Sequence, residues 1–183
     1  MNIVHFLYSF LLCTFVLIAT CKPQKSGTMV RQPYVAGQFY PAKKAELERL
    51  LDSMFAMCKE RQVENVRAII VPHAGYVFSG KTAASAFNQI PDSAHFERII
   101  IIASSHYEYF GGVSIYNKGN YLTPLGEVPV DIPTATELIK NNNFISCNVE
   151  ADQNEHSIEV QLPFLQRKLG TGLTILPVII GTD

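Results

Sequence analysis

The stretch "AIIVPHAGYVFSGKT", residues 68–82, joins an apolar run to a single histidine and a glycine-punctuated segment. The β-branched residues of the run end at Pro72, which is typical of a buried strand. Ser79 is the predicted cap of a following helix, whose small residues let it lie close to a sheet. A second apolar run, "FERIIIIASSHY" at residues 96–107, predicts a second strand. Strand, helix and strand in this order predict a βαβ unit with parallel neighbouring strands.

Further periodic segments extend this unit to an α/β fold, with a mostly parallel sheet covered by helices. Apolar residues at helical spacing predict a helix within residues 43–60, and another helix is expected at 133–143. Turn residues alternate with short apolar pieces over 111–131, which indicates hairpin strands or a long loop. In residues 155–169 an apolar stripe contains Pro163, so we expect a kink or a helix that begins only a few residues before the proline.

The last apolar segment, residues 173–183, predicts a buried strand that no covering helix follows. We therefore expect one face or edge of the sheet to be bare. A chain truncated at the C-terminus, or one that pairs with another polypeptide, would explain this ending. Without the missing part, the protein should be poorly soluble or oligomeric.

The composition is that of one globular domain, with 183 residues, 48% hydrophobic and 17% charged. The net charge is -1, and the 15 basic residues form no cluster, so nucleic acid is excluded as an expected partner. The domain is predicted to span residues 33–183, after a polar linker at residues 22–32.

Residues 1–21, "MNIVHFLYSFLLCTFVLIATC", form a signal-like apolar segment. Its end, "IATC", is similar to the cleavage box of bacterial lipoproteins, which predicts an exported protein attached to the membrane through Cys21. An uncleaved membrane anchor is the alternative, and the protein is cytoplasmic if the segment is not a functional signal. In the body, Cys58 and Cys147 are expected to be separate thiols, with a bridge between them as the minor alternative.

Two histidines mark the predicted ligand site. His73 and His106 each close one strand of the βαβ unit, and ligands of open α/β sheets bind beyond the carboxyl ends of the strands. Adjacent strands lie roughly 5 Å apart, so two imidazoles can converge on one ion. A single histidine here is more often a structural residue, but the pair favours a metal. Neutral imidazole suits iron, copper and zinc alike.

The segment "DQNEHSIE", residues 152–159, is the one dense cluster of acidic residues and histidine in the sequence. His156 or Glu155 is expected to face the ion, as its third ligand or as the acid-base group beside it. In the alternative interpretation, the acidic groups only cap a helix start and interact with its dipole. His5 and His95 are interpreted as incidental.

The segment "GYVFSGKT", residues 75–82, also satisfies the G-x-x-x-x-G-K-[ST] pattern of phosphate-binding loops. Such a loop needs small residues with unusual dihedral angles, whereas Tyr76, Val77 and Phe78 are bulky. The second strand also lacks a terminal aspartate that would hold magnesium. Nucleotide binding is therefore the less favoured alternative.

Four motifs occur in the order and approximate spacing of the Memo family: "AGQFYPA" (36–42), "PHAGYVFSG" (72–80), "SSHY" (104–107) and "EHSIEVQLPFL" (155–165). From Pro33 to its end the chain resembles this family, whose bacterial members are often named AmmeMemoRadiSam system protein B. The resemblance implies a fold related to the catalytic subunits of extradiol-type non-haem iron dioxygenases. It also implies that the phosphate-loop pattern is a coincidence.

The resemblance further implies that His73 and His106 are metal ligands and that His156 lines the same pocket. The expected metal is iron or copper, in a site with oxidoreductase activity. The expected ligand is a small molecule or a peptide, and the expected partner is a radical-SAM protein. The family's remaining ligands, an aspartate and a cysteine, belong to a C-terminal part that this sequence lacks; neither Cys58 nor Cys147 corresponds to that cysteine. The alternative function is a non-catalytic module that binds a peptide or protein in this pocket.

Overall fold

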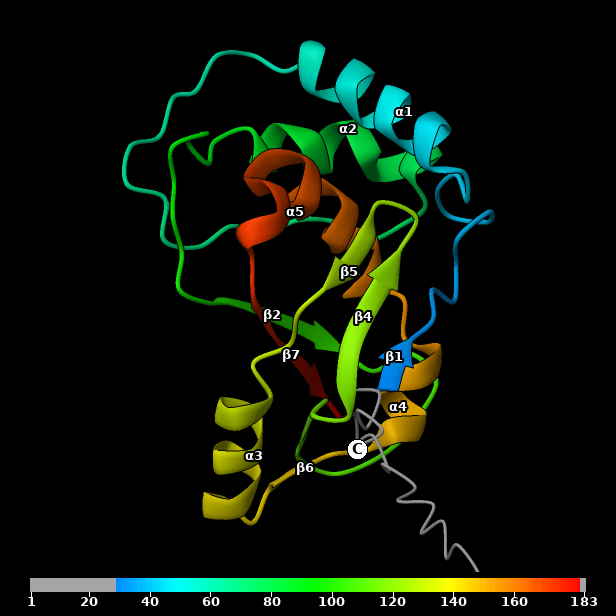
Figure 1. Cartoon of the computed structure of the whole chain (residues 1–183), viewed down its shortest axis with the longest axis vertical. Coiled ribbons are helices and arrows are strands. Elements are labelled where there is room, and N and C mark those ends of the chain that lie inside the picture. Colours follow the sequence, from blue (N-terminus) through cyan, green and yellow to red (C-terminus); the bar gives the residue numbers. More distant parts are fainter. Residues whose placement is uncertain (1–28, 182–183) are drawn as a thin grey trace, which may run out of the picture.

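The computed structural model describes residues 29–181 and contains two small sheets flanked by helices (Figure 1). The larger sheet has the strand order β2-β7-β3-β6, and the smaller has the order β1-β4-β5. The strands of the larger sheet are β2 (Ile99–Ser104), β7 (Ile175–Ile180), β3 (Val113–Ile115) and β6 (Ile145–Ser146). Those of the smaller sheet are β1 (Met29–Arg31), β4 (Gly119–Thr123) and β5 (Gly126–Val128).

The strand pairings confirm the predicted α/β class and show that the sheets are mixed. β1–β4, β2–β7 and β3–β6 are parallel ladders, whereas β3–β7 and β4–β5 are antiparallel. The antiparallel β4–β5 pair is the hairpin expected within residues 111–131. β1 is formed by the last residues of the predicted linker, which pair with β4, and its Arg31 is buried and forms an ion pair with Glu159.

Helices cover the two faces of the larger sheet unequally. α1 (Lys44–Ala56), α2 (Tyr76–Phe87) and α5 (Leu162–Leu169) form a layer at one end of the molecule (Figure 1). Their apolar side chains and those of β7 make the main core, in which Leu47, Leu51 and Phe164 are almost fully buried. α3 (Ile132–Asn141) packs against β3 and β7 in a second, smaller cluster, and α4 (Val149–Asn154) precedes a short 3-10 helix at Glu159–Gln161.

The strand predicted at residues 68–72 is the main error in the expected βαβ unit. This segment contains no strand, and β2 pairs with β7 and with no other strand among residues 29–181. Ile69 and Val71 pack against the main core, whereas the side chain of Ile70 is 99% exposed. The segment is apolar enough for a strand, but no neighbouring strand offers it hydrogen bonds.

The helix after this segment begins earlier than predicted. α2 starts at Tyr76, with Gly75 as its N-cap residue, so Ser79 lies inside the helix. The backbone N–H of Tyr76 donates to the carbonyl oxygen of Phe39, and its hydroxyl donates to the carbonyl oxygen of Val160. Because most of the G-x-x-x-x-G-K-[ST] pattern is helical, its backbone N–H groups cannot wrap around a phosphate. The structure gives no support to nucleotide binding here.

Two other predictions are confirmed by the structure. Pro163 is the second residue of α5, where its missing N–H costs no helical hydrogen bond. The expected buried strand near the end of the chain is β7, whose six residues pair with all of β2.

Residues 1–28 lie outside the described part of the chain, and so do the predicted signal segment, Cys13 and Cys21. Within residues 29–181, no helix combines the length and apolar character that crossing a membrane requires. Cys58 and Cys147 are both free thiols, as expected.

Candidate metal centre

Three histidines from distant parts of the sequence meet at one end of the larger sheet. His73 ends the extended segment before α2, His106 follows β2, and His156 follows α4. Each offers one ring nitrogen, and the three nitrogens lie within 4.8 Å of one another. Nε2 of His73 and Nε2 of His106 are 3.3 Å apart. The predicted convergence of His73 and His106 is therefore present, and His156 joins them.

Glu155 is the group that orients His106. Its Oε2 accepts a hydrogen bond from the backbone N–H of His106 at 2.8 Å, and its Oε1 lies 3.0 Å from Nδ1 of the same residue. The same Oε1 accepts hydrogen bonds from the backbone N–H groups of His156 and Ser157, both at 2.9 Å. With Nδ1 facing the carboxylate, Nε2 of His106 is left to face His73. Such a carboxylate behind a histidine is the usual support of a metal ligand.

The electrostatic surroundings keep two of the rings neutral. Burial and the neighbouring His106 ring lower the pKa of His73. Burial also lowers the pKa of His156, against the opposing effect of Glu155. A neutral imidazole has the free lone pair that metal binding requires. Burial works against ionisation of Glu155, yet hydrogen bonds from Ser157 and His106 hold the pKa of this carboxyl below its ordinary value.

A second buried carboxylate, Glu159, fixes the segment that carries His156. Its oxygens accept hydrogen bonds from Arg31 Nη1 at 2.8 Å and from the Tyr40 hydroxyl at 2.6 Å. They also accept from the backbone N–H groups of Tyr34 and Val35. Arg31 in turn donates to the carbonyl oxygen of Glu155 at 2.6 Å. Glu159 is thus an internal anchor and lies behind the histidines rather than among them.

Asp152, the remaining member of the predicted acidic cluster, also lies in the interior. Its carboxylate accepts hydrogen bonds from the Ser114 and Tyr121 hydroxyls at 2.9 and 3.3 Å. Asp152 and Glu159 are therefore neither exposed helix-dipole partners nor members of the histidine cluster. His95 is exposed and belongs to no group of potential metal ligands among the described residues.

Sequence reasoning missed several residues that shape this site. The Gln161 side-chain amide donates to the carbonyl oxygen of Pro72 at 3.3 Å and so contacts the residue before His73. Phe39 packs edge-on against His156, with 4.9 Å between the ring centroids. Tyr107 lies 6.0 Å from the same ring and is 48% exposed. Phe39, Tyr107 and Gln161 all lie in the quoted motifs, but their partners are remote in sequence.

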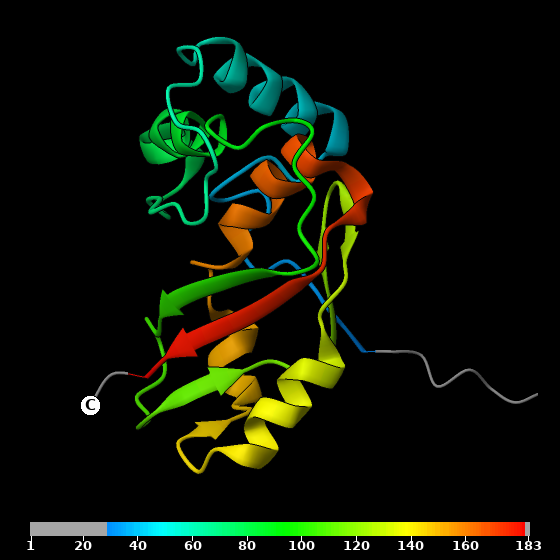
Figure 2. The ribbon, with the colours of Figure 1, turned by 90° about the vertical axis from the view of Figure 1, so that its left-hand side faces the viewer.

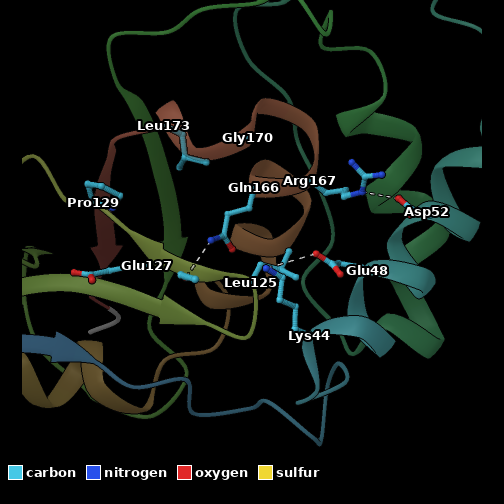
Figure 3. Close-up of a pocket in the computed structure, with 11 residues that line it drawn as sticks. Lys44, Glu48, Asp52, Leu125, Glu127, Pro129, Gln166, Arg167, Gly170 and Leu173 are labelled. Carbon is cyan, nitrogen blue, oxygen red and sulfur yellow. Dashed lines mark hydrogen bonds and ion pairs between the residues drawn. The ribbon is translucent and has the colours of Figure 1, made fainter.

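One cavity among the described residues lies away from the histidines. It has a volume of about 560 Å³ and lies between α1, β5 and α5 (Figure 3). Its charged side chains pair with each other, Arg167 with Asp52 and Lys44 with Glu48. Four of the five charged residues of the lining are therefore matched, and the fifth, Glu127, accepts a hydrogen bond from Asn120. The histidine cluster is the better candidate on chemical grounds.

Known proteins place the chain in one family. Residues 31–183 match the Memo-like protein family. A MEMO1 family protein of Thermoplasma volcanium is 40% identical over 153 residues, which cover 84% of this chain and 56% of the relative. One of Pyrococcus abyssi is 36% identical, over 84% of this chain and 54% of the relative. The chain thus spans about half the length of the curated relatives it matches. With these similarities and the three converging histidines, the chain belongs to the Memo-like protein family.

Proposed function

We propose that this chain binds a redox-active metal ion, iron or copper, through His73, His106 and His156, and that the site carries out oxidoreductase chemistry. The observation that carries the proposal is the convergence of three ring nitrogens within 4.8 Å. Packing does not account for three polar rings facing one another at the end of an apolar sheet. A shared proton can join two imidazoles, but a metal cation can accept a nitrogen lone pair from all three.

The donor set fits this group of metals. Three imidazoles suit iron, copper and zinc, and zinc is the alternative without redox chemistry. The side chain of His106 is 34% exposed, which leaves the centre open to a further ligand from outside. A bound iron or copper ion would supply electron transfer and polarisation of that ligand.

The protein residues have separable roles in this proposal. Glu155 is 1% exposed, and its oxygens already face the His106 ring and three backbone N–H groups, so it acts as a positioning residue. His156, whose side chain is 10% exposed, forms the inner wall of the site and stays neutral. The exposed Tyr107 ring lies at the outer side and would contact a small molecule or peptide that approaches the metal.

Metal content and affinity test the proposal directly. The purified protein is reconstituted with Fe(II), Cu(II) or Zn(II), and bound metal is measured by mass spectrometry after removal of the excess. Single variants His73→Ala, His106→Ala and His156→Ala should each lose most of the bound metal. His95→Ala is the matched control, because His95 is an exposed histidine outside the cluster, and it should retain the wild-type content.

Glu155→Gln refines the same test. It keeps the size of the side chain but removes the negative charge behind His106, so metal affinity should fall roughly 10–100-fold while the fold is retained. Circular dichroism in the near ultraviolet checks the fold of every variant. If the wild type and the His73→Ala/His106→Ala double variant carry equally little metal, the proposal is overturned, and a non-catalytic peptide- or protein-binding pocket takes its place.

A further inference from the structure

One side-chain amide joins the two segments that carry His73 and His156. Nε2 of Gln161 donates to the carbonyl oxygen of Pro72 and to that of Ser157, both at 3.3 Å. Pro72 directly precedes His73, and Ser157 directly follows His156. A primary amide has two N–H hydrogens, so it can satisfy both carbonyl groups at once. Gln161 therefore bridges two of the three histidine-bearing segments.

The segment that carries His73 has few other contacts that fix its position. β2 is the outermost strand of the larger sheet, and no described strand lies beyond it to pair with residues 68–73 (Figure 2). Ile69 and Val71 give the segment apolar contacts with the main core. Among the described residues, the bond from Gln161 is the one hydrogen bond that reaches the backbone of residues 68–73. Because apolar contacts are not directional, this bond fixes where the segment ends.

Gln161 itself lies on an anchored part of the chain. It is 5% exposed and ends the short 3-10 helix before α5. Its backbone N–H donates to the carbonyl oxygen of Ile158 at 3.1 Å. Two positions earlier, Glu159 forms its buried ion pair with Arg31. The amide therefore extends from a fixed backbone toward the less constrained segment before α2.

Glu155 makes the corresponding link to the third histidine. Its Oε1 lies 3.0 Å from Nδ1 of His106 and 3.5 Å from Nδ1 of His156. One short stretch of chain thus organises the whole cluster. Glu155 joins His106 to His156, and Gln161 joins His73 to His156.

We propose that Gln161 is a positioning residue of the histidine cluster, whose amide sets the separation between His73 and His156. The centroids of these two rings are 5.7 Å apart. Without the two N–H donors, the end of the segment before α2 is free to move away from the 3-10 helix, and the His73 ring leaves the other two. The consequence for cation binding rests on the proposed function, whereas the placement of His73 in the metal-free protein does not.

Gln161→Met tests this role, because methionine keeps the length of the side chain but has no N–H donor. In the metal-free protein, nuclear Overhauser effects between the ring protons of His73 and His106 report their contact, since the ring centroids are 5.0 Å apart. These effects should be present in the wild type and lost in Gln161→Met. The affinity for Zn(II), measured by competition with a chelator, should fall roughly 10–100-fold.

Gln166→Met is the matched control. The Gln166 side chain also makes two hydrogen bonds, to the carbonyl oxygen of Gly126 at 3.1 Å and from the Thr123 hydroxyl at 2.6 Å. It lines the cavity that lies away from the histidines. Gln166→Met should keep the ring contacts and the Zn(II) affinity even where it lowers the free energy of unfolding. Equal losses in Gln166→Met would show that general destabilisation accounts for the effect, and would overturn the inference.

Two further measurements keep the inference testable if Gln161→Met does not fold. Gln161→Asn keeps the amide but shortens the side chain by one methylene, so the amide cannot reach both carbonyl groups and the same losses are expected. In the wild type, the side-chain N–H protons of Gln161 should exchange with solvent more slowly than those of the exposed Gln153. Equal exchange rates, or ring contacts that persist in a folded Gln161 variant, would contradict the positioning role.

The two readouts separate this inference from the proposed function. If the wild type binds no Zn(II), Fe(II) or Cu(II), but Gln161→Met still loses the contact between the His73 and His106 rings, the proposed function fails and the positioning role of Gln161 is supported.

Discussion

The two faces of the larger sheet contain similar isoleucines in opposite surroundings. On one face, Ile175 and Ile179 are 0% and 1% exposed, under the layer formed by α2 and α5. On the other, Ile100 and Ile102 are more than half exposed. We call these the closed face and the open face of the sheet. The hydrophobicity of a strand alone therefore does not predict whether its side chains are buried. What matters is whether another element packs on that face.

The histidine cluster lies where these two environments meet. His156 comes from the closed side and its side chain is 10% exposed, whereas the side chain of His106 at the end of β2 is 34% exposed. The closed side also supplies the buried carboxylates Glu155 and Glu159. The difference indicates that the closed side sets the geometry of the site and that the open side controls access to it.

The largest expected effect is on the closed side, at Glu159. Glu159→Gln removes the charge that pairs with the buried Arg31 guanidinium and weakens the acceptor for the Tyr40 hydroxyl. The free energy of unfolding should fall by about 3–5 kcal/mol, because an unpaired buried charge remains. Urea denaturation measures this loss. Asp52→Asn breaks the exposed pair with Arg167 and should cost at most about 1 kcal/mol. Equal losses in the two variants would contradict the anchoring role of Glu159.

The next prediction compares the two faces directly, by making the same isoleucine-to-alanine change on each face. Ile179→Ala on the closed face should lower the free energy of unfolding by about 2–5 kcal/mol, because it leaves a cavity in the main core. Ile102→Ala on the open face should change it by less than about 0.5 kcal/mol in the isolated chain. Both values come from chemical denaturation. A large loss for Ile102→Ala would show that the open face is covered in the chain on its own.

The smallest expected effect concerns pH and the buried carboxyl of Asp152, which accepts a hydrogen bond from Ser114 on the closed face. Burial raises the pKa of Asp152 to about 7, against the opposing effects of Ser114 and Arg31. A pKa that is higher in the folded state means that protonation favours folding. This contribution is complete below the unfolded value of 3.8 and is lost as the pH rises through about 7.

The free energy of unfolding should therefore fall by roughly 2–3 kcal/mol between about pH 5 and pH 8 because of this one group. Asp152→Asn cannot ionise, so its stability should lose this pH dependence and exceed that of the wild type at the upper end. Urea denaturation at several pH values measures both proteins, with Asp52→Asn as an exposed control. An unchanged pH profile in Asp152→Asn would show that Asp152 is ionised throughout this range.

Local patterns in the sequence were sufficient to predict several helices and strands and part of the site. Apolar residues at helical spacing predicted α1, Pro163 predicted where α5 begins, and the β-branched run predicted β2. These features depend on residues that are neighbours in the sequence and on backbone stereochemistry, so they can be predicted from the sequence directly. The positions of His73 and His106 after apolar runs also predicted their convergence, which the structure shows although residues 68–72 form no strand.

Tertiary structure alone decided the rest. Residues 68–72 look like a strand but have no partner, because pairing depends on a neighbour and not on the segment itself. Glu159 looks like a helix-start carboxylate but pairs with Arg31, 128 positions away. Glu155 likewise reaches His106 across 49 positions. Contacts of this range arise only when the chain folds back on itself, so the residue types establish the chemistry available and the fold decides which groups use it.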